Sequence, residues 1–437
     1  MKTRVIKTKI SGGIEKEMSE QKQQSKPKPK ILGMTDASSK TGFGGIMHNI
    51  LNGVSPKYDP YLLGWGFHYE EPIKRGNYTM LPTTGNDYYG RDVLPSILSQ
   101  LKPDVLLTQA DTRMVGWLPE ILKNIPSKPT WIYYPVIDGH VWDAENKQTK
   151  WPSNWTGFMK QADVVVAMTN FGKKILAENG IESETIYHGV DTTLFRPYTE
   201  EQREQLRTNF NFKGKFVVGG VFKNIVRKNP EKYLQAFALF RKGKEDKTIL
   251  VLHTFPQPTG QGEYDLVQQA IDLGLVVGKD VIFTQQGLPT EVMPQLYNSF
   301  DAFWMLGGME SFGVPLIEAM ACGVPTVALE ATTFPEILGG TGLLSPAPVF
   351  PDSNKCPVTM GSYNGVEGVI CDPYDIAKKT QRLYDDKQLR VNMGFKEVER
   401  AIKIFDWSVI KQQWIELLDK HVVSLEQLPD EWKEILG

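Results

Sequence analysis

The sequence has few cysteines, no strong excess of either charge and no long apolar run. Its three cysteines show no metal-ligand spacing, and their odd number argues against a disulfide framework. A formal net charge of -2 argues against nucleic acid as a partner. No apolar run approaches the roughly 20 residues of a membrane helix, and no apolar stretch follows the basic N-terminus as it would in a signal peptide. A cytoplasmic protein with at most peripheral membrane contact is expected.

The 437 residues are too many for one typical hydrophobic core, so two domains are expected. A lysine- and proline-rich stretch closes the first 30 residues and indicates a mobile basic tail. The apolar series is interrupted near Pro197, which predicts a linker there. The expected parts are a tail over 1–30, an N-terminal domain over 31–197, a C-terminal domain over 198–405, and terminal helices over 406–437 that partly cross back to the N-terminal domain.

Short apolar segments alternate with helical patterns in both expected domains. This alternation is typical of a parallel sheet covered on both faces by helices, so the fold class is α/β, with two Rossmann-like doubly wound domains facing a cleft. Ligands in such sheets bind beyond the carboxyl ends of the strands. The predicted strands are residues 31–34, 105–108, 131–134 and 164–167 in the first domain, and 216–219, 249–252, 281–283, 302–306 and 327–328 in the second.

The segment from Leu343 to Val369 contains four prolines and little periodicity. It is interpreted as an inserted loop, and loops of this length serve as functional lids or as decoration.

The most informative stretch runs from Glu310 to Glu318 and carries two carboxylates separated by seven residues. A strand precedes it, and Pro315 suits the first helical turn because its missing N–H costs nothing there. Free backbone N–H groups around Gly313 would form an anion site at the start of that helix. One carboxylate can then meet hydroxyls beyond the phosphates, and the other can meet hydroxyls on the nucleoside side. This arrangement would hold a sugar nucleotide at both ends.

The string from Met309 to Pro325 resembles the signature of the retaining glycosyltransferases of family 4, the glycosyl transferases group 1, which have the two-domain GT-B fold. The family pattern usually has Gly-Phe-Gly after the first glutamate, and Ser311 replaces the first glycine here. The resemblance covers roughly residues 31–418 and is densest from Phe216 to Pro335. The donor-binding residues that it implies in this stretch are Glu310, Ser311, Phe312, Gly313, Val314 and Glu318.

A basic turn follows the first strand of the second domain. A leaving nucleoside diphosphate gains negative charge, so fixed cations beside it speed its departure. The resemblance implies an arginine and a lysine five positions apart, where this sequence has Lys223 and Lys228. Because a lysine lacks the planar fork of arginine, Arg227 could cover for Lys223. A solvated basic turn without a ligand is the alternative.

Two further loops follow strands and carry glycine. The resemblance implies that Gly44 and Gly45, after the first strand, face the donor diphosphate, where glycine lets the backbone approach closely. It also implies that Gly287 and Leu288 lie near the nucleobase. Each loop would equally fit an ordinary tight turn.

The loop after the strand at 131–134 would face the cleft and carries Asp138 and His140. Relatives place a histidine on this acceptor side, and the two residues compete for that position. His140 could hydrogen-bond the transferred sugar, while Asp138 could orient the acceptor hydroxyl. A solvated loop histidine is the alternative. His188, in a turn before the linker, is expected to shape the hinge side of the cleft.

The sequence lacks the Asp-x-Asp pattern by which the other main glycosyltransferase fold holds a metal. We therefore expect no metal and no cofactor beyond the donor substrate. The resemblance implies transfer of a hexose from a nucleoside-diphosphate sugar to an acceptor hydroxyl with retention of configuration. In the family the leaving phosphate helps deprotonate the acceptor, so Glu310 would position the sugar. The candidate catalytic residues are Glu310, Lys228, Lys223, His140 and Asp138.

Three other functions fit parts of the pattern. A sugar-nucleotide epimerase on the same fold would need no acceptor. A DNA-modifying glucosyltransferase would need a basic acceptor groove, which the overall charge argues against. A non-catalytic sugar-nucleotide-binding protein would keep the cleft without turnover. The oligomeric state and the acceptor are not specified by the sequence.

Overall fold

The computed structural model describes residues 27–37, 42–66, 71–83, 86–143, 148–260, 263–284, 287–348 and 365–422. Most of the predicted tail, residues 1–26, and most of the predicted insertion, residues 349–364, lie outside these ranges. The predicted boundaries at residues 30, 197 and 405 therefore stay predictions.

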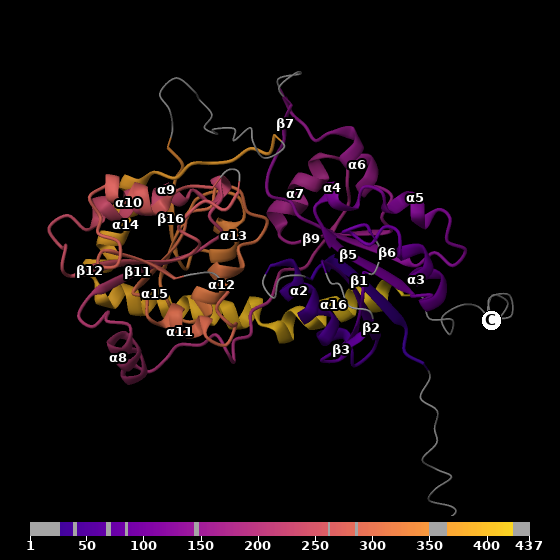
Figure 1. Ribbon diagram of the computed structural model, residues 1–437, viewed down its shortest axis with the longest axis horizontal. Helices are drawn as coiled ribbons and strands as arrows, with labels where there is room; N and C mark the ends of the chain where they lie inside the picture. Colours follow the sequence, from indigo (N-terminus) through magenta and orange to yellow (C-terminus); the bar gives the residue numbers. More distant parts are fainter. Residues whose placement is uncertain are drawn as a thin grey trace, which may run out of the picture.

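An eight-stranded sheet forms the N-terminal half of the molecule, drawn in indigo to magenta in Figure 1. Its strand order is β10-β9-β6-β5-β1-β2-β4-β3, and every neighbouring pair is parallel except β3 with β4. A short antiparallel pair, β7 with β8, stands outside the sheet. The strands are β1 Lys30–Asp36, β2 Asp59–Trp65, β3 Ile73–Arg75, β4 Tyr78–Leu81, β5 Val105–Ala110, β6 Thr130–Pro135, β7 Trp142–Asp143, β8 Gln148–Thr149, β9 Val164–Ala167 and β10 Glu184–Thr185.

Helices cover both faces of this sheet, and one of them comes from the far end of the chain. On one face, α2 and the C-terminal helix α16 share a core that includes Ile50 and Trp414. The other face packs against the helices that lie between β4 and β10. The helices of this half are α2 Phe43–Val54, α3 Leu94–Leu101, α4 Thr112–Val115, α5 Leu118–Leu122, α6 Ser153–Met159, α7 Asn170–Glu178 and, from the C-terminus, α16 Trp407–His421.

A six-stranded parallel sheet forms the second half, with the order β13-β12-β11-β14-β15-β16. One continuous core of buried aromatic and aliphatic side chains fills both faces. Its strands are β11 Phe216–Val221, β12 Thr248–His253, β13 Val281–Thr284, β14 Ala302–Met305, β15 Thr326–Leu329 and β16 Leu343–Ser345. Its helices are α8 Glu200–Asn209, the 3-10 turn η1 Val226–Lys228, α9 Pro230–Phe240, α10 Leu266–Asp272, α11 Met293–Asn298, α12 Val314–Ala321, α13 Phe334–Leu338, α14 Pro373–Asp385 and α15 Lys387–Arg400.

The prediction of two doubly wound parallel-sheet domains is confirmed, with two corrections of detail. Strands β2, β3 and β4 lie between residues 51 and 105, where no strand was predicted, and they extend one edge of the first sheet. The loop prediction for Leu343–Val369 is wrong at its start, because Leu343–Ser345 pairs with β15 as strand β16. Burial of this short apolar segment against the sheet outweighs the prolines that follow it.

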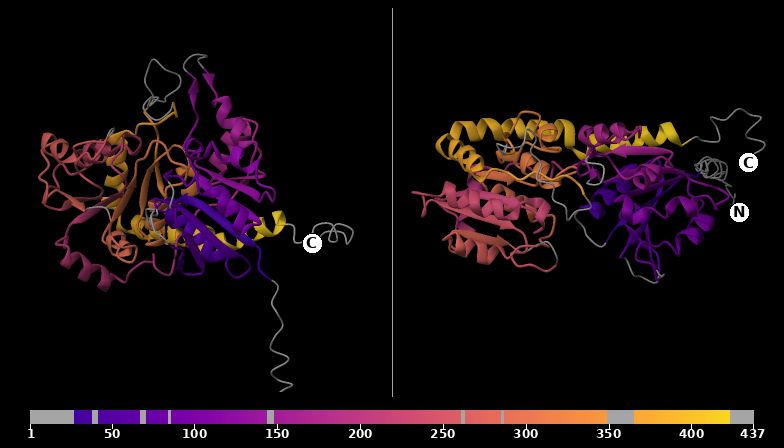
Figure 2. Two further views of the ribbon diagram at one scale, coloured as in Figure 1. Left: turned by 45° about the vertical axis from the view of Figure 1, so that its right-hand side comes forward. Right: turned by 90° about the horizontal axis from the view of Figure 1, so that it is seen from above.

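The end of the chain joins the two domains. After α15, a π-helical turn, η2 Ala401–Phe405, leads into α16, which packs against α2. Figure 2 shows these yellow helices running along both halves of the molecule. At the crossing, the backbone N–H of Val190 donates to Phe405 and that of Trp407 donates to Val190, at 2.7 and 3.1 Å. The turn that carries His188 thus lies where two connections pass between the domains.

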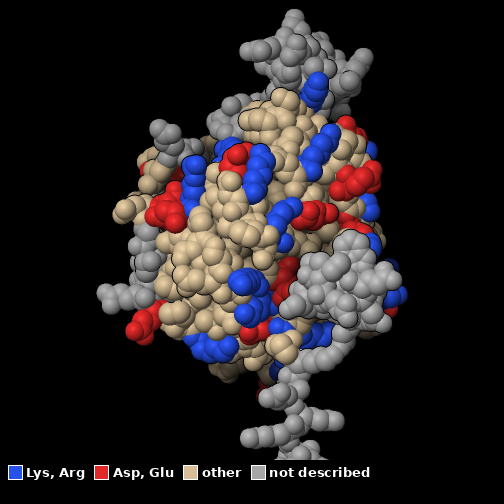
Figure 3. Space-filling model, turned by 90° about the vertical axis from the view of Figure 1, so that its right-hand side faces the viewer, with Lys and Arg blue, Asp and Glu red and all other residues tan. Residues whose placement is uncertain are grey.

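The surface of the N-terminal half carries both signs of charge. On the face in Figure 3, lysine and arginine side chains alternate with aspartate, glutamate and uncharged surface. Among the helices that the structure describes, none has the length and apolar character needed to cross a membrane.

Candidate functional site

The candidate site lies where the carboxyl ends of neighbouring parallel strands meet. The turn η1 follows β11, and the loop Gly307–Gly313 follows β14, which pairs with β11 in the sheet. From the other domain, the loop at 136–141 follows β6. Because parallel strands bring their carboxyl ends to one edge, residues distant in sequence converge there.

Four charged side chains from the two domains form one cluster. Lys228 and Glu310 make a direct ion pair. Arg227 lies 3.6 Å from the second oxygen of Glu310 and 4.0 Å from a carboxylate oxygen of Asp138 in the N-terminal domain. Arg227 also donates a hydrogen bond of 2.8 Å to the backbone oxygen of Met309. Two cations and two carboxylates therefore face one another across the domain interface.

Burial perturbs the titration of this cluster. The Glu310 side chain is buried, and those of Lys228 and Asp138 are largely enclosed. Burial, followed by the charge of Arg227, lowers the pKa of Lys228. Burial raises the pKa of Asp138 even though Arg227 opposes that shift. Charges removed from water in this way are stable only while they are paired.

The loop after Glu310 leads into an uncapped helix start. Gly313 takes a left-handed φ of 92° immediately before α12, and it has no side chain with which to cap that helix. In the first turn of α12, Pro315 has no N–H and the N–H of Leu316 donates 2.9 Å to the oxygen of Gly313, so a ligand anion would meet the N–H groups of Gly313 and Val314. Phe312 is buried, and its ring lies 4.6 Å from that of His188. The first residue of the helix is Val314, and Ser311 and Val314 are partly exposed.

Glu318 lies inside α12 and has a different partner. Its carboxylate accepts a 2.6 Å hydrogen bond from the hydroxyl of Tyr297 on α11. Burial raises the pKa of Glu318 to about 7, and the hydrogen bond from Tyr297 only partly opposes this shift. The two glutamates of the motif thus occupy separate environments, one ion-paired and one beside a tyrosine.

Lys223 and His140 lie apart from the cluster. Lys223 is exposed on the loop after β11, and no ion pair joins it to any residue in the described ranges. His140 turns toward α7, where its Nδ1 lies 3.6 Å from Glu178. It lines a cavity of about 750 Å³ together with residues that include Glu178 and Glu367. Of the two competing acceptor-side residues, Asp138 is the one that faces Arg227.

The glycines that were expected to face the donor take two different positions. Gly44 and Gly45 lie within the first turn of α2, which begins at Phe43, rather than in the loop before it. Gly287 is exposed with a left-handed φ of 99°, and Leu288 packs against the core of the second domain. Their roles in donor binding stay predictions.

A peptide segment that contacts both domains was not predicted from the sequence. We call Gly365–Val369 the crossing segment. Its Val366 forms an antiparallel bridge with Val141, and the N–H of Glu367 donates to the oxygen of His140 at 2.7 Å. At its other end, the N–H of Val369 donates to Gly308 at 3.1 Å. No local pattern signals these contacts, because they join residues more than 60 positions apart.

The arrangement of the two domains is that of solved glycosyltransferases. Sucrose-phosphate synthase from Thermosynechococcus elongatus aligns with a TM-score of 0.69 and 17% identity, covering 90% of this chain and 99% of that one. HepE from Anabaena, solved in complex with UDP-glucose, aligns with a TM-score of 0.65 and 17% identity, covering 90% and 99%. The fold is therefore GT-B.

The C-terminal domain matches one protein-family model. The family model for glycosyl transferases group 1 matches residues 199–349, which include Lys228, Glu310 and Glu318. Through this part of the chain the protein is similar to the group 1 glycosyl transferases.

Curated relatives are named as sugar transferases. The MMP alpha-(1->4)-mannosyltransferase of Mycolicibacterium hassiacum is 23% identical over 284 residues, which cover 62% of this chain and 59% of that protein. The GDP-mannose-dependent alpha-(1-6)-phosphatidylinositol monomannoside mannosyltransferase of Mycolicibacterium smegmatis is 30% identical over 195 residues, covering 41% and 48%. The chain thus spans about half of the length of the curated relatives that it matches.

Proposed function

We propose that the protein transfers a hexosyl group from a nucleoside-diphosphate sugar to an acceptor hydroxyl, with retention of configuration. The observation that carries the proposal is the cluster of Arg227 and Lys228 against Glu310, beside the uncapped start of α12. It combines cations for a diphosphate, backbone N–H groups for an anion and a carboxylate for sugar hydroxyls. The names of its relatives support the same class of reaction.

The cations would act on the leaving group. When the bond between the sugar C1 and the phosphate oxygen breaks, the diphosphate gains charge, which Arg227 and Lys228 stabilise where they stand. Before the donor binds, Glu310 is the carboxylate shared by both cations. Donor phosphate would replace the carboxylate as their partner, and Glu310 would then be free to accept hydrogen bonds from the sugar. The acceptor proton would pass to the departing phosphate oxygen as the new C1–oxygen bond forms.

Asp138 would serve the acceptor side. It approaches the cluster from the N-terminal domain, and its raised pKa reflects its burial. A carboxyl group there can orient an acceptor hydroxyl without taking part in a second displacement. We further propose that no metal is required. We also propose that the protein is cytoplasmic, because the two cysteines in the described ranges, Cys322 and Cys371, are both free and buried.

A panel of UDP-, GDP- and ADP-sugars tests the donor by thermal shift, because a ligand that binds only the folded state stabilises it. The sugar that shifts the melting temperature is then incubated with candidate acceptors, with and without a chelator, and the product anomer is read by NMR. Glu318→Ala and Lys228→Ala are each expected to abolish turnover while the fold is kept. If either variant turned over substrate at the wild-type rate, the proposal would be contradicted.

The same assays separate the competing functions. Conversion of the donor into an epimer in the absence of any acceptor would identify an epimerase. Salt-dependent retention on DNA would favour a DNA-modifying enzyme. Donor binding without transfer to any acceptor would favour a non-catalytic binding protein.

A further inference from the structure

One buried asparagine links three segments of the candidate site. Asn229 lies directly after Lys228, and only 2% of its surface is exposed. Its side-chain amide donates 2.8 Å to the oxygen of Leu306 at the end of β14, and 3.0 Å to the oxygen of Val369 in the crossing segment. Both hydrogens of one amide group are thus used, each on a different segment.

The backbone of Asn229 is adapted to this position. Its φ of 52° and ψ of 45° place it in the left-handed region, which asparagine tolerates better than most residues. It is also the residue before Pro230, where α9 begins. The left-handed turn ends η1 and starts α9 at one residue, and the Asn229 side chain is buried there, next in sequence to Arg227 and Lys228.

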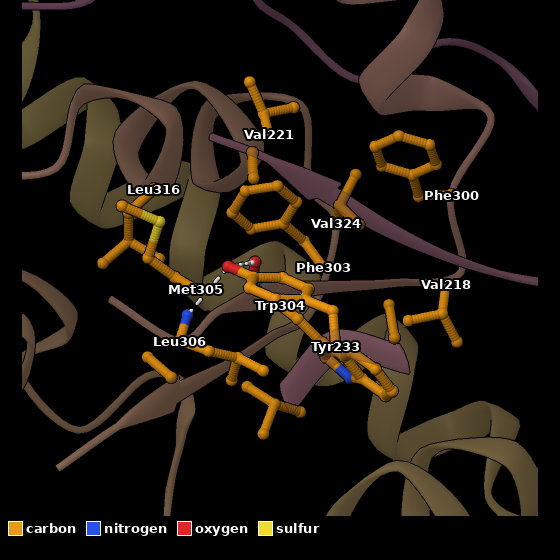
Figure 4. Close-up of a cluster of buried hydrophobic side chains, with 14 of the residues drawn as sticks. Val218, Val221, Tyr233, Phe300, Phe303, Trp304, Met305, Leu306, Leu316 and Val324 are labelled. Atoms are coloured by element: carbon orange, nitrogen blue, oxygen red, sulfur yellow. Dashed lines mark hydrogen bonds between the residues drawn. The ribbon is translucent and has the colours of Figure 1, made fainter. Parts of the chain in front are cut away.

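Tyr233 of α9 also binds the backbone of Leu306. Tyr233, one turn after Asn229, accepts a 3.0 Å hydrogen bond from the N–H of Leu306, and its hydroxyl lies 3.3 Å from the oxygen of Trp304. Figure 4 shows these bonds within the hydrophobic cluster around Trp304. The oxygen of Leu306 is therefore bound by Asn229, just before α9, and its N–H is bound by Tyr233 within α9. Leu306 is followed immediately by the glycines that lead to Glu310.

The crossing segment packs too closely for any side chain at Gly308. A Cβ there would lie 1.9 Å from the oxygen of Val369, the same oxygen that accepts from Asn229. The N–H of Gly308 donates 2.8 Å to Arg227. The turn with the cations, the loop with Glu310 and the crossing segment therefore form one hydrogen-bonded unit, and the crossing segment connects it to His140 and Val141 of the other domain.

We propose that Asn229 is a positioning residue for the transfer reaction: its amide fixes the Arg227–Lys228 turn against the Glu310 loop and the crossing segment, and thereby sets the cations against the carboxylate. This inference rests on the proposed function. A displacement of about 1 Å between such groups can cost on the order of a hundredfold in rate. The bond to Leu306 is buried and the bond to Val369 is partly buried, so their loss removes a hydrogen-bond donor from two carbonyl oxygens that are shielded from water.

The test compares Asn229→Asp and Asn229→Gly with a matched control elsewhere. Aspartate keeps the shape but removes both donated hydrogens, and glycine keeps the left-handed backbone if the aspartate variant fails to fold. The control is Asn298→Asp, because Asn298 is equally buried and its amide also donates to two backbone oxygens, those of Arg196 and Pro294. Each variant is assayed well below its own melting temperature.

The expected result is a kcat lowered by roughly ten- to a hundredfold in the Asn229 variants, with faster amide hydrogen exchange at Gly308 and Val369. Asn298→Asp should lose melting temperature but keep its kcat. An unchanged kcat in the Asn229 variants, or an equal loss in Asn298→Asp, overturns the positioning role. If the wild-type protein binds none of UDP, GDP and ADP in calorimetry, the proposed function itself fails; hydrogen exchange still reports separately whether Asn229 holds the three segments together.

Discussion

The carboxylate of Glu336, in the C-terminal domain, accepts a 2.7 Å hydrogen bond from the backbone N–H of Asn170 at the start of α7 in the N-terminal domain. Its second oxygen accepts from the N–H of Phe171 at 2.9 Å, and the first oxygen also accepts 2.7 Å from the hydroxyl of Tyr187. A carboxylate at the N-terminus of a helix is stabilised by both hydrogen bonds and the helix dipole. This contact joins the two domains.

Glu336→Gln is expected to weaken this contact between the two domains. The substitution removes the charge and one of the two acceptor oxygens, which should cost about 1–3 kcal/mol of the domain contact. Small-angle scattering should show a larger radius of gyration for the variant than for the wild type. The control is Glu330→Gln, which changes an exposed glutamate on the preceding loop. Identical scattering from Glu336→Gln and the wild type would show that other contacts hold the domains.

The two lysines assigned to the diphosphate should differ in importance. Lys228→Met removes a largely buried cation that is paired with Glu310, so kcat should fall by roughly 10²–10³-fold. Lys223→Met removes an exposed side chain and should lower kcat far less. Steady-state kinetics of both variants against donor concentration makes the comparison. An equal loss of kcat in the two variants would instead support a role for Lys223 in binding the diphosphate.

Glu397 should make stability depend on pH. It is fully buried on α15, where one oxygen accepts from the N–H and hydroxyl of Thr326, and burial raises its pKa from 4.5 to about 8. Between these values the unfolded chain releases the proton while the folded protein keeps it, so stability falls as pH rises from about 4.5 to about 8 and is level above that.

The Glu397→Gln variant should lack this decline. At about 1.4 kcal/mol per pKa unit, the difference between wild type and variant should change by on the order of 3–5 kcal/mol across that range. Urea unfolding at several pH values measures it, with Glu399→Gln as the exposed control on the same helix. Parallel curves for the wild type and Glu397→Gln would contradict the expectation.

Trp414 should stabilise the N-terminal domain although it belongs to the last helix. It is fully buried on α16, and its ring lies 5.1 Å from that of Tyr134 on β6. Trp414→Ala should therefore cost about 3–5 kcal/mol. Denaturant unfolding gives the value, and Ile402→Ala, at a position 52% exposed, should change it by no more than about 0.5 kcal/mol. A small effect at Trp414 would mean that α16 does not contribute to the first core.

Continuous apolar strands were predictable, and interrupted ones were not. Strand β9, Val164–Ala167, has four consecutive buried apolar residues, and the bounds predicted from the sequence are the same. Strand β2 includes Pro60 and Gly64, which are turn residues in most contexts, so its pairing with β1 is visible only in three dimensions. Tertiary pairing decided the structure there, against local preference.

The site residues also differ in whether a local motif predicts them or a distant contact positions them. Lys228 and Glu310 were selected from local motifs, and they are in contact in the structure. The sequence left Asp138 and His140 as competitors because they lie two residues apart on one loop. Their directions depend on Arg227 and Glu178, which come from distant parts of the chain. Asn229 gave no signal at all, because its two acceptors are backbone oxygens, which every residue carries.

The return of α16 to the first sheet has a consequence for how the protein is made. Asp419 binds Lys57 and Tyr58, and Trp414 completes a core that begins at Ile31. During synthesis the N-terminal domain therefore emerges from the ribosome with one face of its sheet covered by α2 alone, and that core stays incomplete until residues 407–421 have been translated. Domains usually fold as units, N-terminal first, whereas here the last helix must arrive before the first domain is complete.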